Sequence, residues 1–214
     1  MAALISRRSL VISALGLNSS AIACAKEPKR TRVYQWVQMR TSLGDLTLAV
    51  DQERAPISTG SFLNYVDKHL LDGAQFYRVV HPGNDVNPAK ISVVQGGVVD
   101  ESHMLPSIPH EPTTKTGLRH MDGTISIARR EPGSGSGGSF FICIGDQPAL
   151  DYGGKRNPDG QGFAAFGGVV KGMDVVRAIW AGQTKGTDGS IESQILASPD
   201  SIVSVRRRKG PSGN

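Results

Sequence analysis

The sequence predicts a mainly β protein: a closed antiparallel barrel of eight short strands, capped by two α-helices. Short apolar segments separated by turn residues recur from residue 33 to residue 205, and only two segments have helical spacing. These strands and helices do not alternate regularly, as they would in a parallel sheet. Glycine is abundant, at 26 of 214 residues, but shows no triplet period, which excludes a collagen-like chain.

The predicted strands are short and bounded by turns. The clearest pattern is in segment 46–50, where Leu46, Leu48 and Val50 share one face at a period of two. The predicted strands span residues 33–40, 46–50, 76–80, 91–94, 124–128, 140–144, 163–170 and 202–205. Two longer loops are expected at 81–90 and 152–160, the second rich in Gly, Asn-Pro and Asp-Gly turn pairs.

Two helices are expected. The first begins at Pro56, a residue suited to a first helical turn, and Ser58 or Thr59 would cap it. Its apolar stripe would consist of Phe62, Tyr65, Val66 and His69. The second runs over about 173–181 and stops at Gly182.

Residues 1–25 are typical of an export leader, with a basic, acid-free start and an apolar stretch too short to span a membrane. The arginine pair at 7–8 resembles a twin-arginine signal. Residues 23–25 (Ala-Cys-Ala) fit cleavage of a soluble exported protein. Residues 21–24 (Ala-Ile-Ala-Cys) instead resemble a lipobox, which would place a lipid anchor on Cys24. We expect an exported protein of the periplasm or cell envelope, with a mitochondrial presequence and a plain disordered tail as the alternatives.

The charge distribution argues against a nucleic-acid partner. After residue 25 the chain has 22 basic and 19 acidic residues, and the run 206–209 alone supplies four positive charges. The rest is nearly neutral, unlike the basic face that nucleic-acid binding requires. We expect a linker and first-strand entry at 26–37, one domain at 38–206, and a basic disordered tail at 207–214.

Metal and nucleotide sites are not supported. The five histidines form no H-x-x-x-H pair, so most are expected to be surface or loop residues, and no metal or other cofactor is expected. Cys143 has no cysteine partner within the domain, which makes it a small buried hydrophobe. The run 133–138 matches G-x-G-x-x-G but precedes a predicted strand rather than a helix, so it is not a nucleotide loop.

An arginine between aromatic residues stands out in the predicted strand 76–80. Strand alternation would send Phe76 and Arg78 to one face and Tyr77 to the other. Considered alone, Arg78 would be a strand-edge arginine paired with a nearby acid.

Further motifs along the chain change this interpretation. They are, in order, Phe76-Tyr77-Arg78, Val94-Gln95-Gly96-Gly97, the segment from Gly123 to Arg129, Phe140-Phe141-Ile142, the segment from Phe163 to Gly167, and the segment from Val170 to Val176. Through these motifs, residues 38–205 resemble the cyclophilin family of peptidyl-prolyl cis-trans isomerases. The two long loops are similar to those of bacterial exported members.

The resemblance implies an enzyme that accelerates rotation about X-Pro bonds and assists the folding of exported proteins. Its partners would be proline-containing peptides and unfolded proteins. The implied catalytic residues are Arg78, Gln95 and Phe141, with Arg78 donating to the prolyl nitrogen as the amide twists. The implied substrate-binding residues are Phe76, Val93, Ala128, Arg129, Ser139, Leu150 and Phe163. Phe76 would share the proline pocket with Phe141, and the backbone of Arg129 would hold the peptide.

Some positions depart from the family pattern. Ser139 stands where Gln is usual, and Ala149 stands where cyclosporin-sensitive members have Trp, so weak cyclosporin binding is expected. These two changes motivate an alternative, a peptide-binding module on the same fold with negligible turnover. A small-ligand barrel of the lipocalin kind is a third interpretation. A monomer is expected, because a closed barrel has no unpaired strand edge.

Overall fold

The computed structural model of the protein describes residues 33–186 and 191–210. The predicted leader at 1–25 with Cys24, the beginning of the predicted linker, and residues 211–214 of the predicted tail lie outside the described residues. No helix within the described ranges is long and apolar enough to cross a membrane.

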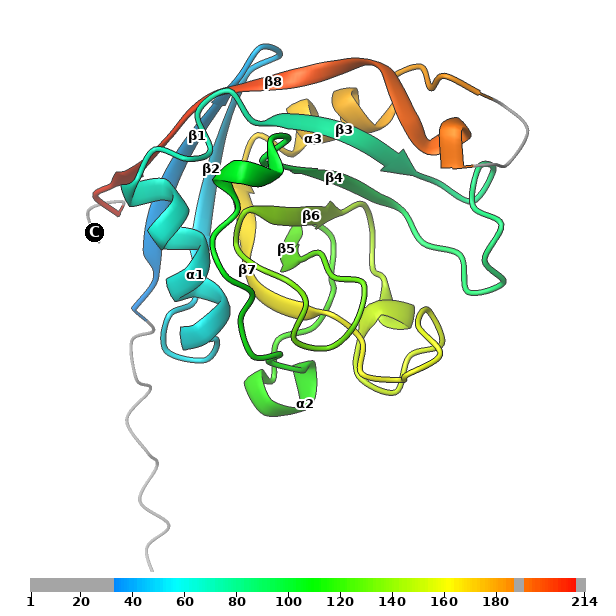
Figure 1. Ribbon diagram of the computed structural model, residues 1–214, viewed down its shortest axis with the longest axis horizontal. Coiled ribbons are helices and arrows are strands. Elements are labelled where there is room, and N and C mark those ends of the chain that lie inside the picture. The colour runs from blue at the N-terminus through cyan, green and yellow to red at the C-terminus, as the bar shows by residue number, and fades with distance from the viewer. Residues whose placement is uncertain (1–32, 187–190, 211–214) are drawn as a thin grey trace, which may run out of the picture. The chain divides into compact units, whose positions relative to one another are not determined.

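Eight antiparallel strands form a closed barrel in the order β1-β2-β7-β5-β6-β4-β3-β8 (Figure 1). The strands are β1 (Gln35–Thr41), β2 (Asp45–Val50), β3 (Gln75–Val80), β4 (Val93–Gly97), β5 (Thr124–Ile127), β6 (Ser139–Cys143), β7 (Ala164–Lys171) and β8 (Ile195–Arg208). The α-helices are α1 (Pro56–Asp67), α2 (Thr113–Thr116) and α3 (Met173–Trp180), and the short 3₁₀ helices are η1 (Glu101–His103), η2 (Pro148–Leu150) and η3 (Ile191–Gln194). The predicted mainly β barrel is confirmed, with the four-residue α2 as an additional element.

Aromatic rings fill the barrel interior and join it to α1. Phe62 of α1 meets Phe140 of β6 edge-to-face at 5.8 Å between ring centroids, and Phe166 of β7 at 5.2 Å. Phe76 of β3 packs on the other side of Phe140, at 5.9 Å. All four rings are fully buried, and each such burial contributes roughly 1.5–3 kcal/mol.

The start of α1 differs from the prediction. Pro56 does occupy the first turn, but neither Ser58 nor Thr59 is the cap, because the helix begins after Ala55. Instead, the buried carboxylate of Glu111 accepts hydrogen bonds from the Ser58 N–H at 2.6 Å and the Ser58 hydroxyl at 2.8 Å. His69 does not extend the apolar stripe, because it lies beyond the helix end with a φ of 58°.

A bulge in β3 interrupts the expected alternation. Phe76 pairs with Gly96 of β4 and Arg78 pairs with Gln95, so Tyr77 has no partner in the register. Such an extra residue lets two successive side chains leave the strand on the same side. The prediction that Tyr77 faces away from Phe76 and Arg78 together is therefore wrong.

The last strand is longer than predicted. β8 covers 195–208 rather than 202–205, and it pairs with both β1 and β3 to close the barrel. Near its end, Arg206 forms an ion pair with Asp72 at 2.7 Å, and Arg207 forms one with Asp67 at 2.6 Å. Part of the predicted disordered tail, from 207 to 208, is thus strand.

Candidate active site

A groove of about 1110 Å³ is lined by side chains from β3, β4 and β6 and by parts of the segments 98–104, 128–136 and 150–163. It brings together most of the residues implied by the sequence: Arg78, Val93, Gln95, Ala128, Arg129, Ser139, Phe141, Leu150 and Phe163. Phe76 is the exception. Because of the bulge, its ring lies in the barrel core against Phe140, so the prediction that Phe76 forms part of the pocket is wrong.

One part of the groove is apolar. Phe141, Val93 and Leu150 belong to a small buried cluster that is separate from the barrel core. Phe163, on the segment before β7, packs edge-to-face on Phe141 with 5.2 Å between ring centroids. This arrangement provides an apolar surface with an aromatic wall, which suits a compact apolar ring.

The Phe141 ring rests on a buried histidine. The His120 ring stacks on it at 5.9 Å with an interplanar angle of 17°. His120 bonds through Nδ1 to Asp151 Oδ1 at 2.7 Å and through Nε2 to the Ser126 hydroxyl at 3.0 Å. Ser126 is fully buried, so this chain of polar groups supports Phe141 and does not present a nucleophile.

No motif of the sequence indicated this role of His120, which lies in a loop as expected but is buried there rather than exposed. Burial by itself raises the pKa of Asp151, but hydrogen bonds from the His120 ring and the His120 N–H outweigh it and hold the pKa below its ordinary value.

Arg78 lies beside the apolar surface in a polar cluster. Its Nη1 donates to Gln95 Oε1 at 2.8 Å, and its Nε donates to Gln194 Oε1 at 3.0 Å. Burial lowers the pKa of Arg78, and the nearby Arg156 cation adds to this effect. A guanidinium nevertheless stays charged, so Arg78 presents a fixed positive charge to the groove.

Tyr77 belongs to the same cluster. Gln95 Nε2 donates to the Tyr77 hydroxyl at 3.1 Å, which orients the amide so that its oxygen faces Arg78. The sequence prediction treated Tyr77 as remote from Arg78, and the bulge in β3 explains the difference.

Arg129 also lines the groove, with its side chain largely buried. Its guanidinium bonds to both carboxylate oxygens of Asp159, at 2.8 and 3.1 Å, and its Nε donates to the Gly162 carbonyl at 2.8 Å. It also lies 5.2 Å from the Phe163 ring centroid, within range of a cation–π contact. The Arg129 side chain therefore fixes the aromatic wall, whereas the hydrogen bond predicted from its backbone to a peptide stays a prediction.

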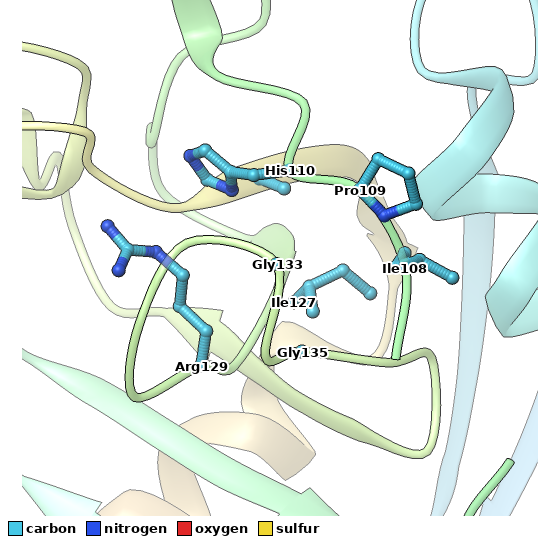
Figure 2. Close-up of a pocket in the computed structure, with 8 residues that line it drawn as sticks. Ile108, Pro109, His110, Ile127, Arg129, Gly133 and Gly135 are labelled. Atoms are coloured by element: carbon cyan, nitrogen blue, oxygen red, sulfur yellow. The ribbon is translucent and has the colours of Figure 1, made fainter. Parts of the chain in front are cut away.

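A second, much smaller cavity of about 10 Å³ is also lined by Arg129 (Figure 2). His110, Pro109 and Ile127 contribute to its wall. This is about the smallest space that can hold one water molecule, so the cavity is too small for a ligand side chain.

The two predicted long loops are joined beside the groove. Arg156, from 152–160, forms an ion pair with Asp85 at 2.6 Å and donates to the Ala89 carbonyl at 3.0 Å. In return, the Asn87 side chain donates to the Arg156 carbonyl at 3.2 Å. This connection, between segments about 70 residues apart, has no local sequence signal.

Within 33–186 and 191–210, no group of three His, Cys, Asp or Glu side chains could hold a metal ion. Cys143 is buried, and burial raises the pKa of its thiol.

Comparisons with known proteins identify the family of this chain. The family model described as cyclophilin type peptidyl-prolyl cis-trans isomerase/CLD matches residues 36–206. A peptidyl-prolyl cis-trans isomerase A of Dickeya dadantii is 36% identical over 151 residues, which cover 70% of this chain and 73% of that protein. Peptidyl-prolyl cis-trans isomerase B of Escherichia coli is 29% identical, covering 67% of this chain and 82% of that protein.

Solved structures give the same fold. A Cryptosporidium parvum cyclophilin-type isomerase aligns with a TM-score of 0.64 at 16% identity, covering 84% of this chain and all of that one. A second structure of that protein was determined in the presence of the dipeptide Ala-Pro, and it aligns with a TM-score of 0.62.

The barrel, the groove and the family match together define a cis-trans isomerase. The chain belongs to the cyclophilin-type peptidyl-prolyl cis-trans isomerases, and the predicted family and enzyme class are confirmed.

Proposed function

We propose that this isomerase uses Arg78 and the apolar part of the groove to accelerate rotation about X-Pro bonds in exported proteins, and so assists their folding in the cell envelope. The observation that carries the mechanism is the position of the Arg78 guanidinium, fixed by two amides in the same groove as Phe141. The export leader predicted at 1–25 supports the place of action.

The chemistry requires only that one rotation become easier. The barrier to peptide-bond rotation is about 18–20 kcal/mol and arises from amide resonance. As the bond twists, resonance is lost and the prolyl nitrogen regains a lone pair. A guanidinium N–H aimed at that nitrogen is stabilising only in the twisted state, so Arg78 lowers the barrier rather than merely tightening binding.

The remaining groove residues would hold the peptide. Phe141, Val93 and Leu150 would receive the proline ring, because they are the buried apolar residues of the groove. Ala128, on the segment after β5, and Ser139, on β6, line the groove where the adjoining peptide would lie. Gln95 would hold Arg78 in place, as its hydrogen bond of 2.8 Å supports.

The deciding experiment is exchange NMR on a short X-Pro peptide with the full chain. Arg78→Ala should lower kcat/KM by roughly 100- to 1000-fold, the usual effect of losing a donor that acts in the transition state. Arg177→Ala is the matched control, because Arg177 forms an exposed ion pair with Asp122 and does not line the groove. Equal activity in wild type and Arg78→Ala would refute the mechanism.

The same experiment addresses the alternative, a peptide-binding module. Peptide chemical-shift changes without acceleration in the wild-type protein would favour binding without turnover.

We expect proline-containing peptides and unfolded proteins as substrates. We expect weak cyclosporin binding, because Ala149 replaces the Trp of cyclosporin-sensitive members. We also expect a monomer. Mass spectrometry of the mature N-terminus would distinguish cleavage after Ala25 from a lipidated Cys24.

A further inference from the structure

Gln194 is a buried residue with a direct contact to Arg78 that no motif of the sequence indicated. It ends η3, immediately before β8, and only 4% of it is exposed. Its Oε1 accepts hydrogen bonds from both Nε and Nη2 of Arg78. One amide oxygen thus receives two N–H groups of the guanidinium.

The Gln194 amide is itself held in one orientation. Its Nε2 donates to the Asn84 carbonyl at 2.9 Å. A flipped amide would place its NH₂ group against the guanidinium and its oxygen against the Asn84 carbonyl, so both contacts would be repulsive. Asn84 is fixed in turn, because its side chain donates to the carbonyls of Val79 and Ser193 at 3.1 and 2.9 Å.

Among the residues that the structure describes, Arg78 has partners for only some of its guanidinium N–H groups. An arginine carries five N–H donors in a rigid fork. Gln194 receives two of them, and Gln95 receives one through Nη1. The two remaining donors, one on Nη1 and one on Nη2, belong to a guanidinium that lines the groove.

The partners of Arg78 also differ in charge from those of two neighbouring arginines. Arg129 and Arg156 line the same groove, and each is paired with a carboxylate, Asp159 and Asp85 respectively. Arg78 is held by two neutral amide oxygens. A carboxylate in the place of Gln194 would hold the guanidinium equally well but would offset its charge.

We propose that Gln194 is a positioning residue for the isomerase reaction, which holds the Arg78 guanidinium toward the groove without neutralising it. This inference rests on the proposed role of Arg78. Gln194 touches Arg78 and would not touch the substrate, so its loss should lower kcat more than it raises KM.

The first test replaces Gln194 by Leu, which has a similar size but no acceptor. In exchange NMR on an X-Pro peptide, Gln194→Leu should lower kcat by roughly 10- to 100-fold with little change in KM, as expected for losing a hydrogen bond to a charged group. Gln38→Leu is the matched control, because the Gln38 side chain bonds to Thr47 and Arg208 and does not line the groove. A wild-type kcat in Gln194→Leu would overturn the proposal.

The second variant, Gln194→Glu, separates position from charge and replaces the first if the leucine variant does not fold. The Arg78 Nε–H resonance in a ¹H–¹⁵N spectrum should keep its hydrogen-bonded shift in Gln194→Glu, while kcat falls because the added carboxylate offsets the cation. A shift retained together with full activity would overturn the claim that a neutral partner is required. Loss of that shift would show that Glu does not hold Arg78 and would overturn the proposed equivalence of the two acceptors.

The double variant distinguishes failure of this inference from failure of the proposed function. If Arg78→Ala alone leaves the rate unchanged, the proposed mechanism fails. If Arg78→Ala is impaired but Gln194→Leu is not, only the positioning role fails. In the Arg78→Ala background, Gln194→Leu should have no further effect, and a further loss as large as in the wild-type background would show that Gln194 acts independently of Arg78.

Discussion

Two apolar clusters of this molecule are built from adjacent residues of the same strands. In β6, Phe140 belongs to the barrel core, whereas Phe141 belongs to the smaller cluster of the groove. The same division separates Val94 from Val93 in β4. Strand alternation therefore gives a single β-strand two functions, because one face closes the interior and the other lines the groove.

The difference lies in what covers each cluster. Phe140 is enclosed by Phe62 and Phe76, and none of its surface is exposed. Phe141 contacts Phe163 and His120 and lines the groove. The core is thus complete without a ligand, while the groove cluster offers apolar surface to one. Substitutions in the barrel core should lower stability, and substitutions in the groove cluster should lower catalytic activity.

The largest expected effect is on the core side of this comparison. Phe140→Ala removes a ring packed between two others and should lower the free energy of unfolding by about 3–5 kcal/mol. Urea denaturation followed by circular dichroism measures this loss. The activity per folded molecule should stay within a few-fold of wild type, because Phe140 does not line the groove. A loss of activity larger than the loss of folded protein would contradict the separation of the two clusters.

Phe141→Ala tests the groove side. It removes the ring that would receive the proline, so kcat/KM should fall by roughly 10- to 100-fold, the equivalent of about 1.5–3 kcal/mol for burying an apolar ring. The free energy of unfolding should fall by less than in Phe140→Ala, because Phe141 belongs to the smaller cluster and not to the barrel core. Paired urea and exchange-NMR measurements on both variants check this. If Phe140→Ala and Phe141→Ala lost the same stability and the same activity, the distinction between the barrel core and the groove cluster would be contradicted.

The smallest expected effect concerns the support beneath Phe141 and depends on pH. The pKa of Asp151 is held below its ordinary value, so the folded state binds this proton less readily than the unfolded state. Its stabilising contribution is present above the unfolded pKa and is lost as the pH falls through the folded pKa, that is, below about pH 4. Asp151→Asn should therefore be less stable than wild type at pH 7, and the difference should shrink at pH 3. Urea midpoints at the two pH values measure it, and a pH-independent difference would show that charge plays no part.

Hydrophobic patterning predicted most of the architecture. The segment 46–50 alternates cleanly and forms β2 with nearly the predicted bounds, because Leu46, Leu48 and Val50 share one buried face; the structure buries Thr47 and Ala49 on the other face as well. β8 was predicted only over 202–205, since its first half contains polar residues and Pro199. Its pairing with β1 and β3 supplies backbone hydrogen bonds that no local pattern shows.

The site was predicted less completely, and the reason is local geometry. Alternation placed Phe76 on the groove side together with Arg78. Because Tyr77 is an extra, unpaired residue in β3, Phe76 instead points to the opposite face of the strand from Arg78. The spacing of Phe76, Tyr77 and Arg78 contains no sign of a bulge. Gln194 was missed for a different reason: it reaches Arg78 across 116 residues of sequence and belongs to no motif.

The order in which the chain is synthesised gives β8 a further consequence. β8 closes the barrel by pairing with β1 and β3, so both of these strands keep an open edge until residues 195–208 are available. Gln194 directly precedes β8 and reaches Arg78 in the same step. A nascent chain that ends before Gln194 and β8 therefore has no closed barrel and lacks the Gln194 hydrogen bonds to Arg78. Its exposed edges on β1 and β3 would make it prone to aggregation. Closure of the barrel and completion of the site therefore depend on the same late segment of the chain.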